Sequence, residues 1–156
     1  MRVANTSVKR VRHPIPTIDE LLQDMNSSKI FNKLDVTWAY HQIVLKPESR
    51  EMTTFVTHKG LFRYKRLMFG MSCAPEMYQK VMQQVLQGCE WVHNIMDDII
   101  VHASNQKEHV KCLENAVRVL RDKGITLNRG NVSSSVYLFF LLFFFFVSSI
   151  VRNLHS

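Results

Sequence analysis

Three aspartates lie in two apolar, strand-like segments, where carboxylates are costly. Asp35 ends the segment KIFNKLD, and the adjacent Asp97 and Asp98 interrupt NIMDDIIV. A carboxylate in such surroundings needs a partner or a metal ion, and two neighbouring carboxylates repel each other until a divalent cation relieves the repulsion. If the two segments meet at one end of a sheet, the three carboxylates suit a pair of Mg²⁺ ions about 3.5–4 Å apart, as in phosphoryl transfer. Taken alone, an Asp-Asp pair is also typical of an ordinary turn.

The periodicity of the chain predicts helices and strands that alternate around these aspartates. Thr17 and Glu20 form a capping-box pattern, which marks the start of a helix. We expect helices over residues 17–25, 75–86 and 105–123, a strand over 29–36, a hairpin within 53–67, two short strands within 91–103, and a last strand over 125–127. This order predicts an α+β fold in which helices cover one face of an antiparallel sheet.

The helix over residues 105–123 carries the clearest local signals. Ser104 is the predicted N-cap, and Gly124 is the predicted stop. Its buried side is predicted to be a stripe of four apolar residues, Val110, Leu113, Val117 and Leu120.

Composition excludes several classes of protein. The 156 residues suffice for one domain, with 20 Lys and Arg against 13 Asp and Glu. The three cysteines, Cys73, Cys89 and Cys112, form no C-x-x-C pair, and the histidines lack zinc-finger spacing. A disulfide scaffold, a zinc finger and a repeat array are therefore excluded. The odd cysteine count and the polar start favour a reduced intracellular location, in the cytoplasm or the nucleus.

The C-terminal residues 130–156 differ from the rest of the chain. Residues 130–151 carry no charge and hold six of the ten phenylalanines. As a helix this stretch would span roughly 33 Å, enough for a membrane anchor. A buried core segment and a translated non-coding, pyrimidine-rich tract are the alternatives. We expect a domain boundary at residue 129, with an aberrant Phe-rich tail beyond it.

Several motifs in consecutive order carry a family resemblance. Residues 1–129 contain HPIPTIDELL, KIFNKLDVTWAYHQIVL, GLFRYKRLMFGMSCAPEMYQKVM, NIMDDIIVHASNQKEHV and LRDKGITLN. Together these resemble the reverse transcriptase domain of gypsy-type long-terminal-repeat retrotransposon polyproteins. The resemblance implies a polymerase palm, which is a ferredoxin-like antiparallel sheet with helices on one face, with incomplete fingers and no thumb.

The resemblance also implies roles for individual residues. Asp35, Asp97 and Asp98 match the catalytic, metal-binding aspartates, so the expected cofactor is a pair of Mg²⁺ ions, with Mn²⁺ as a substitute. Ile95 stands where the family's Y-x-D-D box usually has tyrosine. Tyr40 matches the aromatic residue that crowds the ribose 2′ position.

Two further segments match the family's substrate-binding parts. Phe69 and Gly70 match the F-G-x-x-x-A-P segment that lines the nucleotide pocket. A basic stretch, Lys59, Arg63, Lys65 and Arg66, could contact template–primer phosphates, or it could be the solvated face of a hairpin.

The implied function is RNA-directed DNA polymerisation, which joins a dNTP to a primer 3′-hydroxyl on an RNA or DNA template. The implied partners are therefore template with primer and dNTPs. We expect this chain to be weak or inactive alone, because the clamps that hold the template–primer are missing. The alternatives are a non-catalytic retroelement remnant that binds nucleic acid or a protein, and a small membrane-anchored protein.

Overall fold

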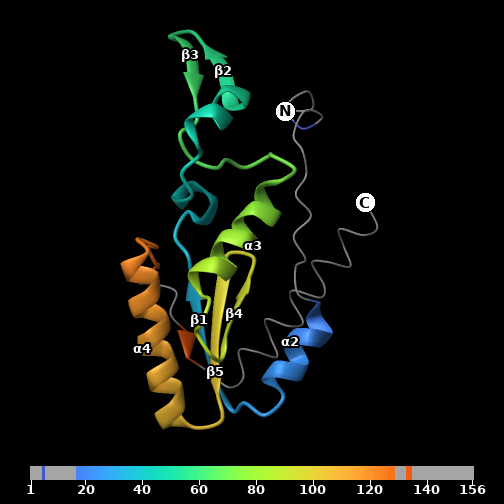
Figure 1. Ribbon diagram of the computed structural model, residues 1–156, viewed down its shortest axis with the longest axis vertical. Coiled ribbons are helices and arrows are strands. Elements are labelled where there is room, and N and C mark those ends of the chain that lie inside the picture. Colours follow the sequence, from blue (N-terminus) through green and yellow to red (C-terminus); the bar gives the residue numbers. More distant parts are fainter. Residues whose placement is uncertain (1–4, 6–16, 129–132, 135–156) are drawn as a thin grey trace.

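The computed structural model describes residue 5, residues 17–128 and residues 133–134 (Figure 1). The helices are α2 (Ile18–Met25), α3 (Ala74–Val85) and α4 (Gln106–Asp122), and the strands are β1 (Ile30–Asp35), β2 (Thr54–Thr57), β3 (Gly60–Arg63), β4 (Val92–Ile95), β5 (Asp98–Ala103) and β6 (Ser133–Ser134). Three 3-10 turns, η1 (Ala39–Gln42), η2 (Pro47–Ser49) and η3 (Glu51–Thr53), lie between β1 and β2. The expected helices before residue 124, the first strand, the hairpin and the strand pair are confirmed.

Four strands form one antiparallel sheet, in the order β4-β5-β1-β6. The β1–β5 register places Asp35 directly opposite Asp98. The β2–β3 hairpin is a separate two-stranded sheet, and it projects away from the four-stranded sheet (Figure 1).

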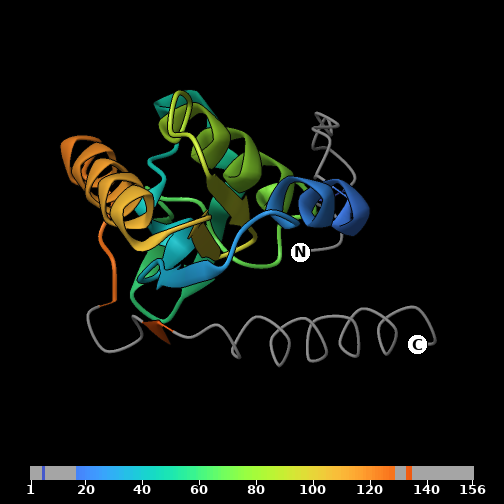
Figure 2. The ribbon, with the colours of Figure 1, turned by 90° about the horizontal axis from the view of Figure 1, so that it is seen from below.

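Helices α3 and α4 cover one face of the four-stranded sheet (Figure 2). Alternate residues of β1 and β5 point into this layer, because side chains alternate between the faces of a strand. Leu34, Ile99 and Val101 are therefore almost fully buried, and they meet Met82 of α3 and Leu120 of α4. Burial of side chains of this size contributes about 1.5–3 kcal/mol each, so this layer holds the sheet rigid.

Helix α2 reaches the opposite face of the sheet. It begins with the predicted capping box, in which the Thr17 hydroxyl accepts a hydrogen bond from the Glu20 N–H and the Glu20 carboxylate accepts one from the Thr17 N–H. Asp24 lies 3.9 Å from His93 Nε2 of β4. Just after the helix, the Ser28 hydroxyl lies 2.7 Å from Nδ1 of the buried His102 of β5.

The buried side of α4 differs from the prediction. The N-cap is Asn105, not Ser104, because its side chain accepts the Glu108 N–H. The buried residues are His109, Ala116 and Leu120, whereas Val110 and Val117 are 41% and 37% exposed. The apolar pattern missed this rotation because His109 gains a hydrogen bond with the Val101 backbone and the small Ala116 packs within the core.

The strand predicted over residues 125–127 is wrong. Only Leu127 forms a bridge, with Val36. The Thr126 N–H donates to Gln42 Oε1 over 2.7 Å, and the Thr126 carbonyl accepts from Gln42 Nε2 over 2.9 Å. The Gln42 side chain thus bonds to the N–H and the carbonyl of Thr126, which are groups that pair with a neighbouring strand in a regular sheet.

The Phe-rich stretch lies outside the described residues, except for Ser133 and Ser134, which pair with β1. No helix in the described part of the chain is long and apolar enough to cross a membrane. The domain boundary at residue 129 and the membrane segment stay predictions.

Candidate active site

The three aspartates meet at one end of the four-stranded sheet. Asp35 is the last residue of β1, Asp98 is the first residue of β5, and Asp97 lies in the turn between β4 and β5. The Asp97 carbonyl accepts the N–H of Val36 over 3.2 Å, which ties this turn to the end of β1. Because directly opposed residues project from the same face of a sheet, Asp35 and Asp98 share one face.

The surroundings of Asp97 and Asp98 disfavour the ionisation of these two carboxylates. Burial, and then the charges of Asp98 and Asp35, raise the pKa of Asp97. Burial also raises the pKa of Asp98, although its hydrogen bond and ion pair with Lys33 act in the opposite direction. The site therefore concentrates negative charge that the sheet balances only in part.

Two residues that sequence analysis missed hold the carboxylates. Lys33 Nζ lies 2.7 Å from Asp98 Oδ2, and Asn128 Nδ2 donates to Asp35 Oδ2 over 3.2 Å. The strand period contained the signal for Lys33, because residues two apart in β1 share a face and Lys33 thus lies beside Asp35. Asn128 carried no local signal, since its position depends on how the chain returns after α4.

The donor set suits Mg²⁺, which prefers carboxylate oxygens. Burial first, and then repulsion between the carboxylates, raise the pKa of Asp97 and Asp98, and a divalent cation would offset both effects. Among the described residues, however, no three His, Cys, Asp or Glu side chains converge as a ready-made metal site. The residues fit the ion chemically, and the contact with Lys33 involves only one of the two carboxylate oxygens of Asp98.

An aromatic cluster adjoins the carboxylates. The ring of Tyr40, in η1, lies 4.9 Å from the ring of Phe69 and 5.4 Å from that of Tyr78, measured between centroids. Burial, and then the nearby charge of Asp97, raise the pKa of Tyr40. Tyr78 of α3 lies behind Tyr40 and is fully buried. The predicted ribose-side residue is thus packed between two aromatic rings and feels the charge of Asp97.

The segment after the aromatic cluster adopts a tight conformation. Gly70 has φ +86°, a left-handed value that favours glycine. Its carbonyl accepts a hydrogen bond from Asn5 Nδ2 over 3.0 Å, and the Ser72 N–H donates to Asn5 Oδ1 over 3.0 Å. Phe69 is 55% exposed, although its ring contacts those of both Tyr40 and His41.

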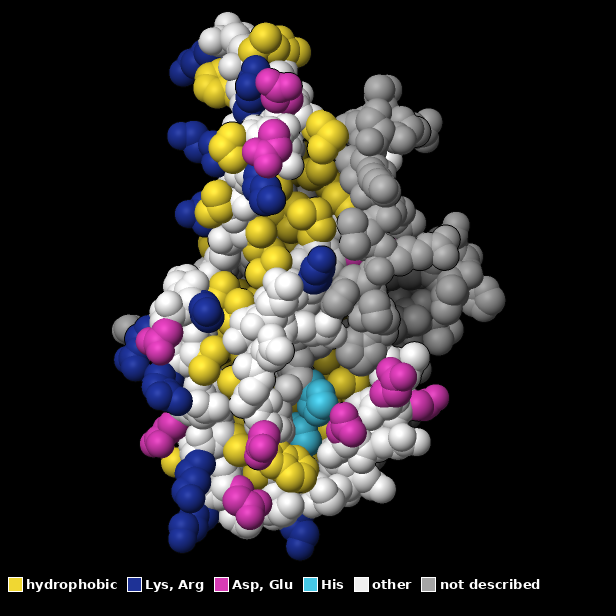
Figure 3. All heavy atoms as spheres, in the orientation of Figure 1, with side chains coloured by type: hydrophobic (Ala, Val, Ile, Leu, Met, Phe, Trp, Pro, Cys, Tyr) yellow, Lys and Arg dark blue, Asp and Glu magenta, His cyan; other side chains and the backbone are white. Residues whose placement is uncertain are grey.

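The four basic residues do not converge on the carboxylates. Lys59 and Arg63 lie in the β2–β3 hairpin, and Arg63 pairs loosely with Glu51 at 3.6 Å. Arg66 donates to the carbonyls of residues 41 and 42, so it fastens η1. In Figure 3, Lys and Arg side chains gather with hydrophobic ones at the hairpin end of the molecule.

The fold matches solved retroviral structures. A foamy viral protease-reverse transcriptase in complex with RNA/DNA hybrid matches 85% of this chain with TM-score 0.75 and 18% identity, and the match spans 18% of that protein. A related foamy viral structure in complex with ds DNA gives TM-score 0.69 at 18% identity, over 85% of this chain and 23% of that one. These likenesses show a mixed α+β fold that corresponds to part of a retroviral reverse transcriptase.

Sequence relatives agree with the fold. The Transposon Tf2-3 polyprotein of Schizosaccharomyces pombe is 32% identical over 127 residues, and the uncharacterized protein K02A2.6 of Caenorhabditis elegans is 31% identical over 124 residues. Each match covers 80% of this chain, and the chain spans about a tenth of the length of these relatives. The family described as reverse transcriptase (RNA-dependent DNA polymerase) matches residues 1–132. The chain therefore belongs to the reverse transcriptase family and is homologous to the polyproteins of gypsy-type retrotransposons.

Proposed function

We propose that this chain is a palm-centred part of a reverse transcriptase and that it takes part in RNA-directed DNA polymerisation. The observation that carries the proposal is the placement of three carboxylates at one sheet end, with Asp35 opposite Asp98 and Asp97 in the adjoining turn. In this reaction the primer 3′-oxygen bonds to the α-phosphorus of a dNTP. The bond from that phosphorus to the bridging oxygen breaks, and pyrophosphate leaves.

The carboxylates hold the metal ions of this reaction. Asp35, Asp97 and Asp98 are the proposed ligands of two Mg²⁺ ions, for which Mn²⁺ can substitute. Bound Mg²⁺ would supply Lewis-acid activation of the phosphate and the primer hydroxyl. Lys33 partly neutralises Asp98 through its 2.7 Å contact with Oδ2, and the second oxygen of the Asp98 carboxylate would remain available to a metal ion.

Tyr40 is the proposed contact for the sugar of the incoming nucleotide. Its ring is held between Phe69 and Tyr78, so it has little freedom to move aside. A rigid ring at that place excludes a ribose 2′-hydroxyl and favours deoxynucleotides. Phe69 and Gly70 would line the same pocket.

The hairpin is the proposed contact for the template–primer. Lys59, Arg63 and Lys65 are exposed, and their charges suit phosphates. Arg66 is exposed too, but its bonds to η1 favour a supporting role. Related foamy viral enzymes are seen with an RNA/DNA hybrid and with ds DNA, which supports this class of partner.

A second candidate function is that of a non-catalytic nucleic-acid-binding or interaction module. The Lys33–Asp98 ion pair favours it, because an ammonium group already takes the place of a cation. The chain also spans only about a tenth of its relatives, so we expect weak primer extension by this chain alone. An intracellular location and a membrane anchor through residues 130–151 remain proposals, and alkaline carbonate extraction of expressing cells tests the anchor.

The decisive test is primer extension by the full chain on an RNA template with an annealed DNA primer, with Mg²⁺ and with Mn²⁺. Asp97→Asn should abolish any extension, whereas the control Asp19→Asn, on the exposed side of α2, should leave it unchanged. Extension that survives Asp97→Asn would overturn the proposed metal site. Nucleic-acid binding by a folded chain that neither extends a primer nor binds Mn²⁺ would establish the second candidate.

A further inference from the structure

A buried pair of amide side chains joins α3 to the strand before the aspartate turn. Gln79 of α3 and Asn94 of β4 are 2% and 6% exposed. Gln79 Nε2 donates to the Asn94 carbonyl over 3.1 Å, and Asn94 Nδ2 faces Gln79 Oε1 at 3.4 Å. Buried polar groups are costly unless they are paired, so the bonds of Gln79 and of the Asn94 Nδ2 favour this placement of α3 against β4, whereas Asn94 Oδ1 is buried without a partner among the described residues.

The same amide reaches forward into the turn. Asn94 Nδ2 donates to the Met96 carbonyl over 2.8 Å, only one residue before Asp97. Met96 itself has φ +54°, a conformation that costs about 1–2 kcal/mol for a residue with a Cβ. A strained backbone of this kind persists only where neighbouring contacts over-determine it. The Asn94 side chain supplies such a contact from the buried side.

Tyr78, the residue next to Gln79 on α3, contacts the proposed nucleotide side of the site. Tyr78 packs its ring against Tyr40, the proposed sugar contact, while Gln79 binds the strand that leads to the carboxylates. Successive residues of one helix thus contact the nucleotide side and the metal side. A rigid α3, buried at Tyr78, Gln79 and Met82, keeps these two sides in register.

We propose that Gln79 and Asn94 are positioning residues that hold the Met96–Asp97 turn in the conformation that presents Asp97 and Asp98 to metal. The inference rests on the proposed function for its consequence, which is metal affinity. The ordering of the Met96–Asp97 turn by this pair does not depend on bound metal. Neither side chain contacts substrate in this scheme, and both act through the backbone of the turn.

The test uses the full chain and Gln79→Met, which keeps the length of the side chain and removes both hydrogen bonds. Gln84→Met, at an exposed position of the same helix, is the matched control. Hydrogen exchange of residues 96–98 and of α4 is measured by mass spectrometry, and Mn²⁺ affinity by electron paramagnetic resonance. We expect exchange in the turn to rise about 10-fold, with α4 unchanged, and Mn²⁺ binding to weaken by about 10-fold.

Asn94→Leu provides a second variant, which should loosen the same turn. Unchanged exchange in the turn of both variants would overturn the inference. Global unfolding of both would overturn it as well, because the pair would then support the whole fold and not the turn. The proposed function fails separately, if Asp97→Asn leaves Mn²⁺ binding of the wild-type chain unaltered or if the wild-type chain binds none.

Discussion

At the carboxylate end of the sheet, the chain is held from several sides, whereas the contacts that the described residues make with the β2–β3 hairpin lie at its base. The turn with Asp97 is tied to Val36 by the backbone and lies next to the fully buried Ile99. Within residues 17–128, no helix layer comparable to α3 and α4 packs on the hairpin. Val56 and Leu61, paired across its strands, are 77% and 75% exposed.

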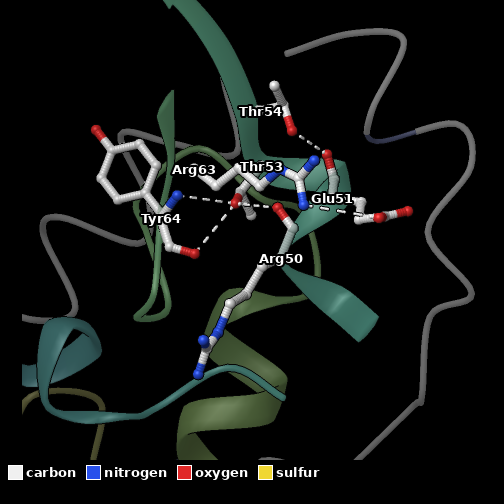
Figure 4. A network of polar contacts seen from close by, with 6 residues as sticks. All are labelled: Arg50, Glu51, Thr53, Thr54, Arg63 and Tyr64. Carbon is white, nitrogen blue, oxygen red and sulfur yellow. Dashed lines mark hydrogen bonds and ion pairs between the residues drawn. The ribbon is translucent and has the colours of Figure 1, made fainter. Parts of the chain in front are cut away.

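A small polar network closes the base of the hairpin (Figure 4). The Thr53 hydroxyl donates to the Arg50 carbonyl over 2.6 Å and accepts the Tyr64 N–H over 3.0 Å. The Thr54 hydroxyl donates to the Glu51 carbonyl, also over 2.6 Å. Thr53 is buried, so its hydrogen bonds are shielded from water, unlike the loose Arg63–Glu51 ion pair.

The sheet end and the hairpin lose folding stability for different reasons. At the sheet end the carboxylates repel one another, and the packed core beneath the strands keeps them close together. The hairpin exposes apolar side chains on both faces, since Phe55 and Phe62 pair on the side opposite Val56 and Leu61. Two-stranded hairpins are only marginally stable alone, so its order depends on the network at its base.

The largest effect is expected at the sheet end. Asp97→Asn should lower metal-dependent extension by at least about 100-fold, because a ligand is lost. The same change should raise the melting temperature near pH 7. The pKa of Asp97 is raised in the folded state, so its ionisation above that pKa disfavours folding. Calorimetry beside the extension assay checks both parts, and a lower melting temperature would contradict the electrostatic account.

The next test compares the packing of the sheet core with that of the hairpin. Ile99→Ala, under the carboxylates, should reduce the free energy of unfolding by about 3 kcal/mol, because it opens a cavity in a close-packed core. Leu61→Ala, on the hairpin, should change it by less than about 0.5 kcal/mol. Urea unfolding of the two variants measures the difference. Similar losses would show that the hairpin is packed as firmly as the core.

A pH-dependent loss of stability is expected on the α2 side of the sheet. Burial and the neighbouring His93 lower the pKa of His102 to about 4, with His109 acting in the same direction and Asp24 against it. The unfolded chain therefore binds protons that the folded chain excludes between the ordinary histidine pKa, about 6.5, and about 4. Stability should fall by about 2 kcal/mol from pH 7 to pH 5.

His102→Gln keeps a polar partner for Ser28 and cannot titrate in this range. Its melting temperature should depend less on pH than that of the wild-type chain, with a residual slope from His93, whose pKa burial also lowers. An equal slope in the two proteins would assign the acid sensitivity to other groups.

The smallest effect is expected at the base of the hairpin. Thr53→Val leaves the Tyr64 N–H and the Arg50 carbonyl without their buried partner, at a cost of about 1 kcal/mol. Proteolysis within residues 54–63 should accelerate while the sheet stays intact. Thr54→Val, at an exposed position, is the control and should have little effect.

Much of the fold was predictable because its signals are local. The capping box at Thr17, the stop at Gly124 with φ +75°, and the hairpin turn before Gly60 all act over three or four residues. The rotation of α4 was not predictable, since the burial of His109 depends on the β5 backbone. The strand predicted at 125–127 is reduced to a bridge between Leu127 and Val36, flanked by backbone hydrogen bonds to Asp35 and Thr37, and this pairing also depends on segments remote in the chain.

The sequence alone determined the family, the order of the elements and the candidate aspartates, because these depend on residue types at fixed spacing. Tertiary structure decided what surrounds the aspartates. Lys33 faces Asp98 through strand register, Asn128 reaches Asp35 across 93 residues, and Gln79 meets Asn94 only because α3 packs against β4. Such contacts join segments that are remote in the chain, and no local pattern of residue types encodes the register and packing that bring them together.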